Sequence, residues 1–475
     1  MSLRKWAFVL AAPHSGSGKT TVTLAILAAL RKRGLTVQPF KVGPDFIDPG
    51  LHTLVTGTVS RNLDGWMLSR DVNRSIFARW LQAAHGAVVE GVMGLFDGYD
   101  GATEAGSTAE MAKWLEIPVV LVVDARSMAR SVAALVHGFC SFDPDMRCAG
   151  IIFNRIGSEA HLEFLREAMT VSHPNLPVLG GLPREDTLKL PERHLGLVTA
   201  EEIPLDQAFV DQAARWAETH LDLNRLLTIT TLETGDLESI ASQAEALNPI
   251  PAVPKRGLTE RPVIAVARDA VFCFYYQDNL DLLESFGARL RFFSPLAGET
   301  IPEDASALYL GGGYPEVHAK ALRNNQRFFN DLQDFAASNR PIYAECGGLM
   351  VLSQSIELLS GEKVPMAGLL PFGVRMLSRR KALGYVEVVL TRSCLLGEPG
   401  MKVRGHEFHY SEIDHLSNSA NLSYCYRLQA RKYRLEQDEG YQVGSVLASY
   451  VHLHWGSAPQ AAAFFTEAAR KVFCS

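Results

Sequence analysis

The chain has 475 residues, of which 47% are hydrophobic and 21% are charged. This balance is typical of globular domains, and at about 150 residues per domain the length predicts two or three of them. It excludes a disordered chain, a collagen-like chain and a small disulfide-stapled protein. No apolar run approaches the ~18 residues of a membrane span, and a net charge of −6 disfavours nucleic acid as a partner.

The seven cysteines include no Cys-x-x-Cys pair, so neither a disulfide framework nor a zinc site is indicated. The first residues lead straight into a strand-like segment, without an apolar leader and a cleavage site, so we expect no signal peptide. Together these features predict a protein of the reducing cytoplasm.

The first half of the chain alternates apolar strands with helix-like stretches. Strands are expected at residues 6–12, 36–41, 87–91, 119–124 and 150–154. This alternation predicts a parallel sheet with helices on both faces.

A proline-rich stretch at residues 248–256 interrupts this pattern. Proline continues neither a helix nor a central strand, so we expect a linker at 236–259, which includes the helix-like residues 237–247. Further strands are expected at 263–267, 307–310, 341–344, 385–391 and 444–450. The predicted fold is therefore α/β, with one domain at 1–235 and a second at 260–475.

A glycine-rich loop at residues 11–21, with the sequence Ala-Ala-Pro-His-Ser-Gly-Ser-Gly-Lys-Thr-Thr, lies between the first strand and a helix expected at 22–33. Glycines let backbone N–H groups curl around phosphates, and the helix N-terminus adds positive potential. We expect Lys19 to reach the β- and γ-phosphates and Thr20 to ligate Mg²⁺. Pro13 stands where the standard loop has its leading glycine. The residues expected to bind nucleotide are Gly16, Ser17, Gly18, Lys19, Thr20 and Thr21.

Acidic residues follow the next two strands. Asp45 and Asp48 come after the second strand, and Glu90 ends the third. Ligands of open α/β sheets gather at the carboxyl ends of the strands, so these acids and Thr20 form the predicted Mg²⁺ site. The alternative is that they are turn and capping residues.

Three further polar residues are candidates in the same crevice. Lys41 is expected to meet a phosphate or a substrate carboxylate, and Asp97 is expected to contact substrate. Asn154 closes a later strand, where it would hydrogen-bond the edge of a nucleotide base.

In the second half, Cys346 directly follows a strand and precedes two glycines, as in a nucleophile elbow. The start of the next helix favours thiolate there. His452 and His454 are the candidate bases, and the N–H groups of the glycine loop Gly311, Gly312 and Gly313 are expected to stabilise an oxyanion. The alternatives are a buried inert thiol and a zinc site.

Two aromatic segments allow two interpretations each. Residues 404–411 alternate polar and aromatic side chains. They form either a strand with one polar face or a pocket lining that includes His409. The aromatic side chains at 272–276 either pack in a core or form a wall for a large flat ligand.

These motifs carry a family resemblance. Cys346 in Ala-Glu-Cys-Gly-Gly, Leu-Gly-Gly-Gly-Tyr-Pro-Glu at 310–316 and His452 resemble class I, triad-type glutamine amidotransferase domains. The phosphate loop with Lys-Val-Gly-Pro-Asp-Phe-Ile-Asp-Pro-Gly at 41–50 resembles the dethiobiotin-synthetase-like ATP-binding domain of cobyrinic acid a,c-diamide synthases. Pro-Glu-Arg-His-Leu-Gly-Leu at 191–197 and Ala-Arg-Asp at 267–269 match the same family.

The resemblance implies that ATP activates peripheral acetate carboxylates of a corrin-type macrocycle, while Cys346 and His452 release ammonia from L-glutamine. It implies ATP and Mg²⁺ as cofactors and small molecules as partners. A homodimer is a separate expectation. Triad-type domains carry a glutamate two residues after the histidine, whereas this chain has His454 there, a change that fits the diamide synthases.

Two other functions remain open. One is the same amidation on hydrogenobyrinic acid or nickel sirohydrochlorin. The other is an ATP-switched, partner-binding protein that resembles partitioning ATPases, although Pro13 and His14 stand where those proteins have a signature lysine.

Overall fold

The computed structural model describes residues 5–190, 192–193, 196–197, 206–233, 235, 242, 261–414, 421–429 and 436–474. The chain divides into two compact units, Met1–Asn248 and Pro249–Ser475. Almost all of the predicted linker at 236–259 lies outside the described residues, as does part of the 191–197 motif. The predicted domain bounds therefore stay a prediction.

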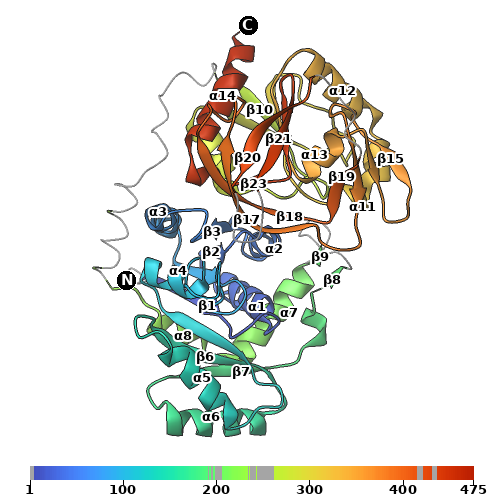
Figure 1. Ribbon diagram of the computed structural model, residues 1–475. Helices are drawn as coiled ribbons and strands as arrows, with labels where there is room; N and C mark the ends of the chain where they lie inside the picture. Colours follow the sequence, from blue (N-terminus) through green and yellow to red (C-terminus); the bar gives the residue numbers. More distant parts are fainter. Residues whose placement is uncertain are drawn as a thin grey trace. The chain divides into compact units, whose positions relative to one another are not determined.

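The N-terminal unit is built on a seven-stranded sheet in the order β3-β2-β4-β1-β5-β6-β7 (Figure 1). Every neighbouring pair in it is parallel. Its strands are β1 (Trp6–Ala11), β2 (Val37–Val42), β3 (Arg61–Leu63), β4 (Gly86–Glu90), β5 (Val119–Asp124), β6 (Cys148–Ile156) and β7 (Val178–Pro183). The parallel sheet was predicted, but β3 and β7 were missed, because one has three residues and the other contains two glycines.

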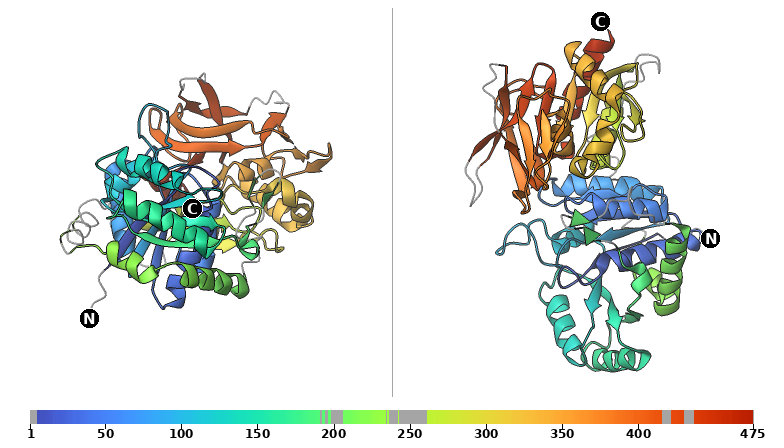
Figure 2. Two further views of the ribbon diagram at one scale, coloured as in Figure 1. Left: turned by 90° about the horizontal axis from the view of Figure 1, so that it is seen from below. Right: turned by 90° about the vertical axis from the view of Figure 1, so that its right-hand side faces the viewer.

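Helices cover both faces of this sheet, which explains why its strands are apolar on both sides (Figure 2). Along β1, Phe8 and Leu10 pack beneath α1, α2, α7 and α8, whereas Ala7 and Val9 pack beneath α3 to α6. The helices are α1 (Lys19–Lys32), α2 (Ile47–Thr56), α3 (Arg70–Gln82), α4 (Thr108–Leu115), α5 (Ser131–Ser141), α6 (Glu159–Ser172), α7 (Gln207–His220) and α8 (Leu223–Ile229). Single turns and short pairs complete the unit: η1 (Asp186–Leu188), β8 (Glu192–Arg193) and β9 (Gly196–Leu197).

Serine caps fix the start of three of these helices. The hydroxyl oxygens of Ser69, Ser107 and Ser158 accept hydrogen bonds from backbone N–H groups in the first turns of α3, α4 and α6. Such caps satisfy N–H groups that the helix itself leaves without an acceptor.

The C-terminal unit has a ten-stranded sheet in the order β11-β10-β12-β13-β22-β21-β20-β17-β18-β23, and a four-stranded sheet in the order β15-β14-β16-β19. The large sheet is parallel from β11 to β22 and antiparallel beyond it. Its strands are β10 (Val263–Ala267), β11 (Arg289–Phe293), β12 (Ala305–Leu310), β13 (Ile342–Glu345), β17 (Ala382–Leu390), β18 (Lys402–His409), β20 (Ser423–Leu428), β21 (Gln437–Val443), β22 (Val446–Ser449) and β23 (His452–Leu453). The smaller sheet has β14 (Ser355–Glu357), β15 (Lys363–Pro365), β16 (Gly373–Met376) and β19 (Ser411–Asp414).

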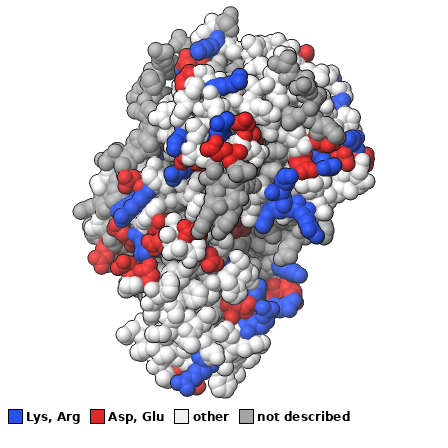
Figure 3. All heavy atoms as spheres, viewed as in Figure 1, with Lys and Arg blue, Asp and Glu red and all other residues white. Residues whose placement is uncertain are grey.

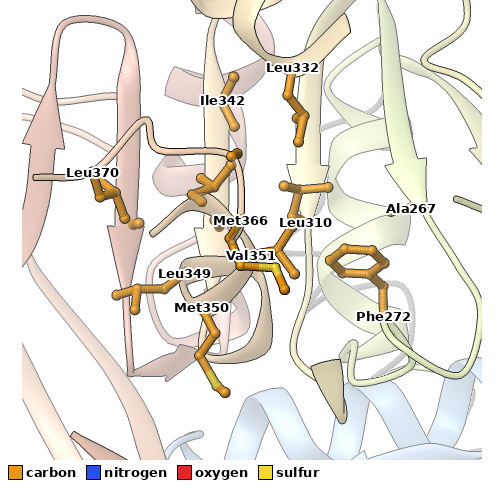
Figure 4. Packing of buried hydrophobic residues seen from close by; sticks show 14 of the residues in the cluster. Ala267, Phe272, Leu310, Leu332, Ile342, Leu349, Met350, Val351, Met366 and Leu370 are labelled. Atoms are coloured by element: carbon orange, nitrogen blue, oxygen red, sulfur yellow. The ribbon is translucent and has the colours of Figure 1, made fainter. Parts of the chain in front are cut away.

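Helices again pack on the two faces of the large sheet. They are α10 (Gln277–Ser285), α11 (Pro315–Arg323), α12 (Gln326–Ala337), α13 (Gly347–Leu352), η3 (Trp455–Ser457) and α14 (Gln460–Phe473). Figure 4 shows Leu349 and Val351 of α13 among Leu310, Ile342 and Leu370, so the short helix is anchored in the core.

Charged side chains of both signs are interspersed on the face of the molecule that Figure 3 shows. Ion pairs such as Arg289–Asp304 and Arg375–Glu412 join them on the surface of the C-terminal unit. Across the described residues, no helix combines the length and the apolarity needed to cross a membrane.

Gly180 provides a test of the packing between β7 and the end of α7. Its φ is +151°, and an added Cβ would lie 2.0 Å from the carbonyl oxygen of His220. Since this obstacle is backbone, Gly180→Ala should lower the free energy of unfolding by about 1–3 kcal/mol, seen as a lower thermal midpoint. Gly138→Ala in α5 is the matched control. It meets nothing within 4 Å and should stabilise the unit slightly. Equal midpoints for the two variants would contradict the close packing.

Candidate active sites

The loop between β1 and α1 folds tightly because two of its glycines have left-handed backbone angles. The φ values are +80° at Gly16 and +87° at Gly18. The side-chain amide of Asn154 donates to the carbonyl oxygen of Ser17 at 2.9 Å, and an added Cβ on Gly18 would lie 2.3 Å from that amide nitrogen. Asn154 therefore braces the loop from β6, and its contact with a nucleotide base stays a prediction.

Lys19 and Thr20 begin α1 directly after this loop, and their side chains are held at the carboxyl edge of the sheet. The Lys19 ammonium donates to the carbonyl oxygen of Met93 at 2.5 Å. Burial, followed by repulsion from Lys41, lowers the pKa of Lys19. Thr21 follows within the first turn of the helix. The lysine thus lies among groups that would gain from a bound phosphate.

Two carboxylates from different elements, Asp48 of α2 and Glu90 of β4, converge on the Lys41 ammonium at the end of β2. Its nitrogen lies 2.5 Å from Asp48 Oδ2 and 3.0 Å from Glu90 Oε1. The Thr20 hydroxyl donates to the same Glu90 oxygen at 2.7 Å and lies 3.4 Å from Asp48 Oδ2. The structure therefore brings together Thr20, Lys41, Asp48 and Glu90, as their positions after successive strands predicted.

A fifth member of this cluster, His52, was not predicted. It lies on α2, is fully buried, and its Nε2 is 2.8 Å from Glu90 Oε2, while its Nδ1 is 3.2 Å from the Ser60 hydroxyl. The two residues are 38 positions apart in the sequence. No local motif joins them, so only the packing of α2 against β4 reveals the contact.

The cluster contains two buried carboxylates but one ammonium close to both. Burial and the charge of Asp45 raise the pKa of Asp48 well above its ordinary value. Burial opposes ionisation of Glu90 as well, yet Lys41 and His52 outweigh it and hold the pKa of Glu90 well below its ordinary value. Burial also lowers the pKa of Lys41, but the two acids overcome this effect and raise it. A further positive charge at this point would let Asp48 ionise.

These donors suit Mg²⁺. Hydroxyl and carboxylate oxygens are its preferred protein ligands, and it takes one or two carboxylates together with water and phosphate oxygens. Among the described residues, no group of three His, Cys, Asp or Glu side chains forms a metal cage on its own. The residues therefore fit an ion that a nucleotide would carry into the site.

Two of the predicted acids are already engaged in turns. Asp45 Oδ1 accepts from the Ile47 N–H at 2.8 Å, while its Oδ2 lies 3.9 Å from the Lys41 ammonium. Asp97 Oδ2 accepts from the Gly94 N–H at 2.9 Å. Both follow the capping alternative, because one carboxylate oxygen of each holds its own loop. A metal role for Asp45 and a substrate role for Asp97 stay predictions.

In the C-terminal unit, Cys346 occupies a strained turn between β13 and α13. Its φ is +45° and its N–H donates to the Ser449 carbonyl at 2.7 Å. A left-handed φ is uncommon for a side chain of this size and persists where the surroundings impose it. An added Cβ on Gly348 would lie 2.3 Å from the Leu310 carbonyl oxygen, so the elbow requires glycine there.

The glycine loop after β12 lies against this elbow, and its three residues differ in what they offer. The Gly311 N–H donates to the Tyr275 hydroxyl at 2.8 Å, which removes it as an oxyanion donor and corrects that prediction. Gly313 has a φ of +153°, and its nitrogen lies 3.0 Å from where a Cβ on Gly347 would stand. The N–H groups of Gly312 and Gly313 stay predicted oxyanion donors, and the N–H of Gly347 at the start of α13 is a further candidate.

His452, a predicted base, and His409, a predicted pocket residue, lie in one buried cluster beside the elbow. An added Cβ on Gly312 would be 2.4 Å from His452 Cε1. The His409 ring stacks on Tyr450 with centroids 4.0 Å apart, and its Nδ1 lies 2.7 Å from the Ser411 carbonyl oxygen. The ring of His454 packs against Tyr276, and its Nδ1 accepts from the Gly456 N–H and caps η3. Its roles as base or zinc ligand receive no support.

Burial is the main influence on the pKa values of the candidate nucleophile Cys346 and the candidate base His452. Burial, followed by the charge of Glu316, raises the pKa of Cys346 far above its ordinary value. Burial, followed by repulsion from His409, lowers the pKa of His452 to about 3. The predicted thiolate is therefore wrong for the resting site: α13 has only six residues, and its N-terminus does not offset the desolvation.

Two buried glutamates, which sequence reasoning missed, hold the backbone on either side of His452. Glu345 accepts from the Leu453 N–H at 3.1 Å, and Glu439 accepts from the Tyr450 N–H at 2.8 Å. Burial raises the pKa of each to about 7. The segment from β22 to β23 is thus held both by β13, which lies far earlier in the sequence, and by the nearby β21.

Aromatic residues near the elbow pack in the core. Phe272 and Tyr276 are at most 1% exposed, and Phe272 lies in the same cluster as Leu310 (Figure 4). For these two rings the core alternative is confirmed, and the wall for a flat ligand is wrong.

Comparisons with known proteins agree with this arrangement. Residues 8–198 match the family model of the CobQ/CobB/MinD/ParA nucleotide binding domain, and residues 263–460 match that of the CobB/CobQ-like glutamine amidotransferase domain. A cobyrinate a,c-diamide synthase of Syntrophotalea carbinolica is 47% identical over 466 residues, which cover 97% of this chain and 98% of the relative. The chain belongs to the cobyrinate a,c-diamide synthase family.

Other members of the family are similar over equal lengths. Those of Leptospira interrogans (strain Fiocruz L1-130) and Salmonella typhimurium are each 41% identical, and cover 98% and 99% of this chain and 99% and 100% of their own lengths. The family and the two-part α/β fold predicted from the motifs are confirmed. The chain thus carries a nucleotide-binding domain and a glutamine amidotransferase domain in one polypeptide.

The neutral resting thiol can be tested by alkylation. Because the pKa of Cys346 is raised, its iodoacetamide reaction should speed up about tenfold per pH unit from pH 7 to 9.5, without a plateau. Peptide masses would follow Cys346, with exposed Cys474 as the internal reagent control. A rate that stays constant over this range would indicate a preformed thiolate and contradict the structure.

Proposed function

We propose that this protein is an ATP- and glutamine-dependent ligase that amidates the a and c acetate carboxylates of cobyrinic acid in cobalamin biosynthesis. The observation that carries the proposal is the pairing, in one chain, of a phosphate loop beside buried acidic residues with a cysteine elbow whose neighbouring glycine loop lies against His452. Near-full-length similarity to cobyrinate a,c-diamide synthases supports the choice of substrate.

The first step concerns the carboxylate, which resists attack by ammonia because its leaving group would be oxide. Transfer of the γ-phosphoryl group of ATP converts it to an acyl phosphate. Lys19 and the N–H groups of the loop hold the transferring phosphate, and Thr20, Asp48 and Glu90 are the residues that would hold Mg²⁺. The bound ion supplies charge neutralisation at the phosphates.

The second step concerns glutamine. His452 is neutral and takes the thiol proton as the sulfur of Cys346 attacks the side-chain amide. The N–H groups of Gly312, Gly313 and Gly347 are the donors available to stabilise the oxyanion. The proton passes to the leaving nitrogen, ammonia departs, and water then hydrolyses the thioester to glutamate. Ammonia displaces phosphate from the acyl phosphate, and the product is the amide.

His409 would line the glutamine pocket, since it lies in the cluster with Tyr450 beside the elbow. Lys41 would neutralise substrate or phosphate charge, as it already does for Asp48 and Glu90. Cytoplasmic location and a homodimer remain predictions.

The substrate is the part of the proposal that needs a direct comparison. Hydrogenobyrinic acid and nickel sirohydrochlorin would require the same chemistry, because the metal belongs to the substrate. Purified protein with ATP, Mg²⁺ and glutamine should amidate cobyrinic acid in preference to these, and each amidation lowers the product mass by about one unit. A partner-stimulated ATPase indifferent to glutamine would instead favour the partitioning-type alternative, which leaves the cysteine elbow without a role.

Separating the two nitrogen sources tests the two-site scheme. Cys346→Ser should lower glutamine-dependent amidation about a thousandfold or more and leave amidation with free ammonia near the parent rate. Lys19→Ala should lower both by about a hundredfold. Lys32→Ala, at an exposed position of the same helix, is the control. Loss of both activities in the cysteine variant would contradict the scheme.

The acidic cluster can be tested through the metal requirement. Glu90→Gln should raise the Mg²⁺ concentration for half-maximal ammonia-dependent amidation by about tenfold. Exposed Glu163→Gln should leave it unchanged. An unaltered Mg²⁺ dependence in the Glu90 variant would remove it from the ion's ligands.

A further inference from the structure

The orientation of His452 needs an explanation, because no acid follows it two residues later. Position 454 is a histidine whose Nδ1 accepts from the Gly456 N–H at 3.2 Å and caps η3. That nitrogen is therefore committed to the turn that follows β23. What holds the His452 ring must come from another strand.

The ring of His406 lies directly opposite. His406 on β18 and His452 on β23 form a register pair in the antiparallel ladder. Their rings are stacked, with centroids 5.0 Å apart and planes 18° from parallel. The two side chains are 4% and 1% exposed, so both lie inside the protein. Cross-strand ring pairs of this kind restrict rotation about the side-chain bonds.

His406 is itself fixed from a third element. The hydroxyl of Tyr276, at the start of α10, lies 2.8 Å from His406 Nδ1. The Tyr276 ring also packs against the ring of His454, with centroids 4.5 Å apart. Rotation of His406 would break this hydrogen bond inside the core, which is costly.

The opposite side of His452 is closed by the glycine loop. A Cβ on Gly312 would lie 2.4 Å from His452 Cε1, and the Phe274 ring meets the imidazole edge-on at 6.4 Å. The backbone of Leu453 is fixed at both polar groups, by Glu345 at its nitrogen and by Asn279 at its oxygen. The imidazole therefore occupies a slot between the ring of His406 on one side and the glycine loop with Phe274 on the other.

We propose that His406, held by Tyr276, is the positioning residue that orients the catalytic imidazole of His452 in place of the missing acid. This inference rests on the proposed glutaminase function of Cys346 and His452. Burial, together with His452 and His454, keeps the pKa of His406 well below its ordinary value, so the ring is neutral. A neutral aromatic face also attracts the imidazolium that forms when His452 takes the thiol proton.

Substitutions of His406 and Tyr276 separate the effect of the stacked His406 ring from the effect of its hydrogen bond with the Tyr276 hydroxyl. His406→Leu keeps most of the volume and removes both. It should lower kcat for glutamine hydrolysis about tenfold or more, with KM changed less than about threefold. His406→Phe keeps a flat ring and should recover most of that loss. Tyr276→Phe should lower kcat about threefold. Ammonia-dependent amidation should stay at the parent rate in all three.

Tyr424→Phe, which removes a hydroxyl from β20, a strand that pairs with β17 and β21, is the control and should match the parent. Parent-like kcat in His406→Leu, a Phe variant no better than Leu, or a loss that appears in KM would each overturn the proposal. If His406→Leu fails to fold, as judged by its thermal midpoint, Tyr276→Phe decides, and a parent-like kcat there overturns it. If the Cys346→Ser variant still hydrolysed glutamine at the parent rate, the proposed function would be overturned instead.

Discussion

A parallel sheet that is covered by helices on both faces can place polar chemistry only at its ends, and this constraint shapes both units. Strands such as β1 and β13 are buried throughout, so their interiors must be apolar. The loops that leave their carboxyl ends carry the phosphate loop in one unit and the cysteine elbow in the other. In each case the chain turns sharply, and residues with left-handed backbone angles, Gly18 and Cys346, make the turn.

In the N-terminal unit, the buried acidic side chains at the ends of the strands are compensated by the positive charge of Lys41. Lys41, Asp48 and Glu90 are at most 5% exposed, and leaving one member of such a buried set unpaired typically costs about 3–5 kcal/mol. The ammonium of Lys41 keeps the two acids in place before any ligand binds. Thr20 and His52 take further hydrogen bonds to Glu90, so its carboxylate is oriented as well as neutralised. The acids are thus oriented before any ligand binds, as the Mg²⁺ site that we propose would require.

In the C-terminal unit, by contrast, the candidate nucleophile Cys346 and the candidate base His452 are held neutral. Burial raises the pKa of Cys346 and lowers that of His452, so the proton remains on sulfur until a substrate occupies the site. A neutral imidazole has no charged partner to orient it, so its neighbours must fix the plane of the ring. Here aromatic rings and hydrogen-bonded backbone surround the imidazole of His452.

The sequence by itself determined the motifs and their neighbours within a few residues: the parallel strands, the loop before α1, the elbow at Cys346 and the acids at strand ends. These features follow from local patterns, because strand periodicity and the positions of glycines can be recognised within short stretches of the sequence. Only the tertiary structure decided the contacts of His52 with Glu90, of Glu345 with Leu453 and of His406 with His452, which join residues 38, 108 and 46 positions apart. It alone decided the protonation of the thiol, because a pKa depends on burial, and burial is a property of the packed chain.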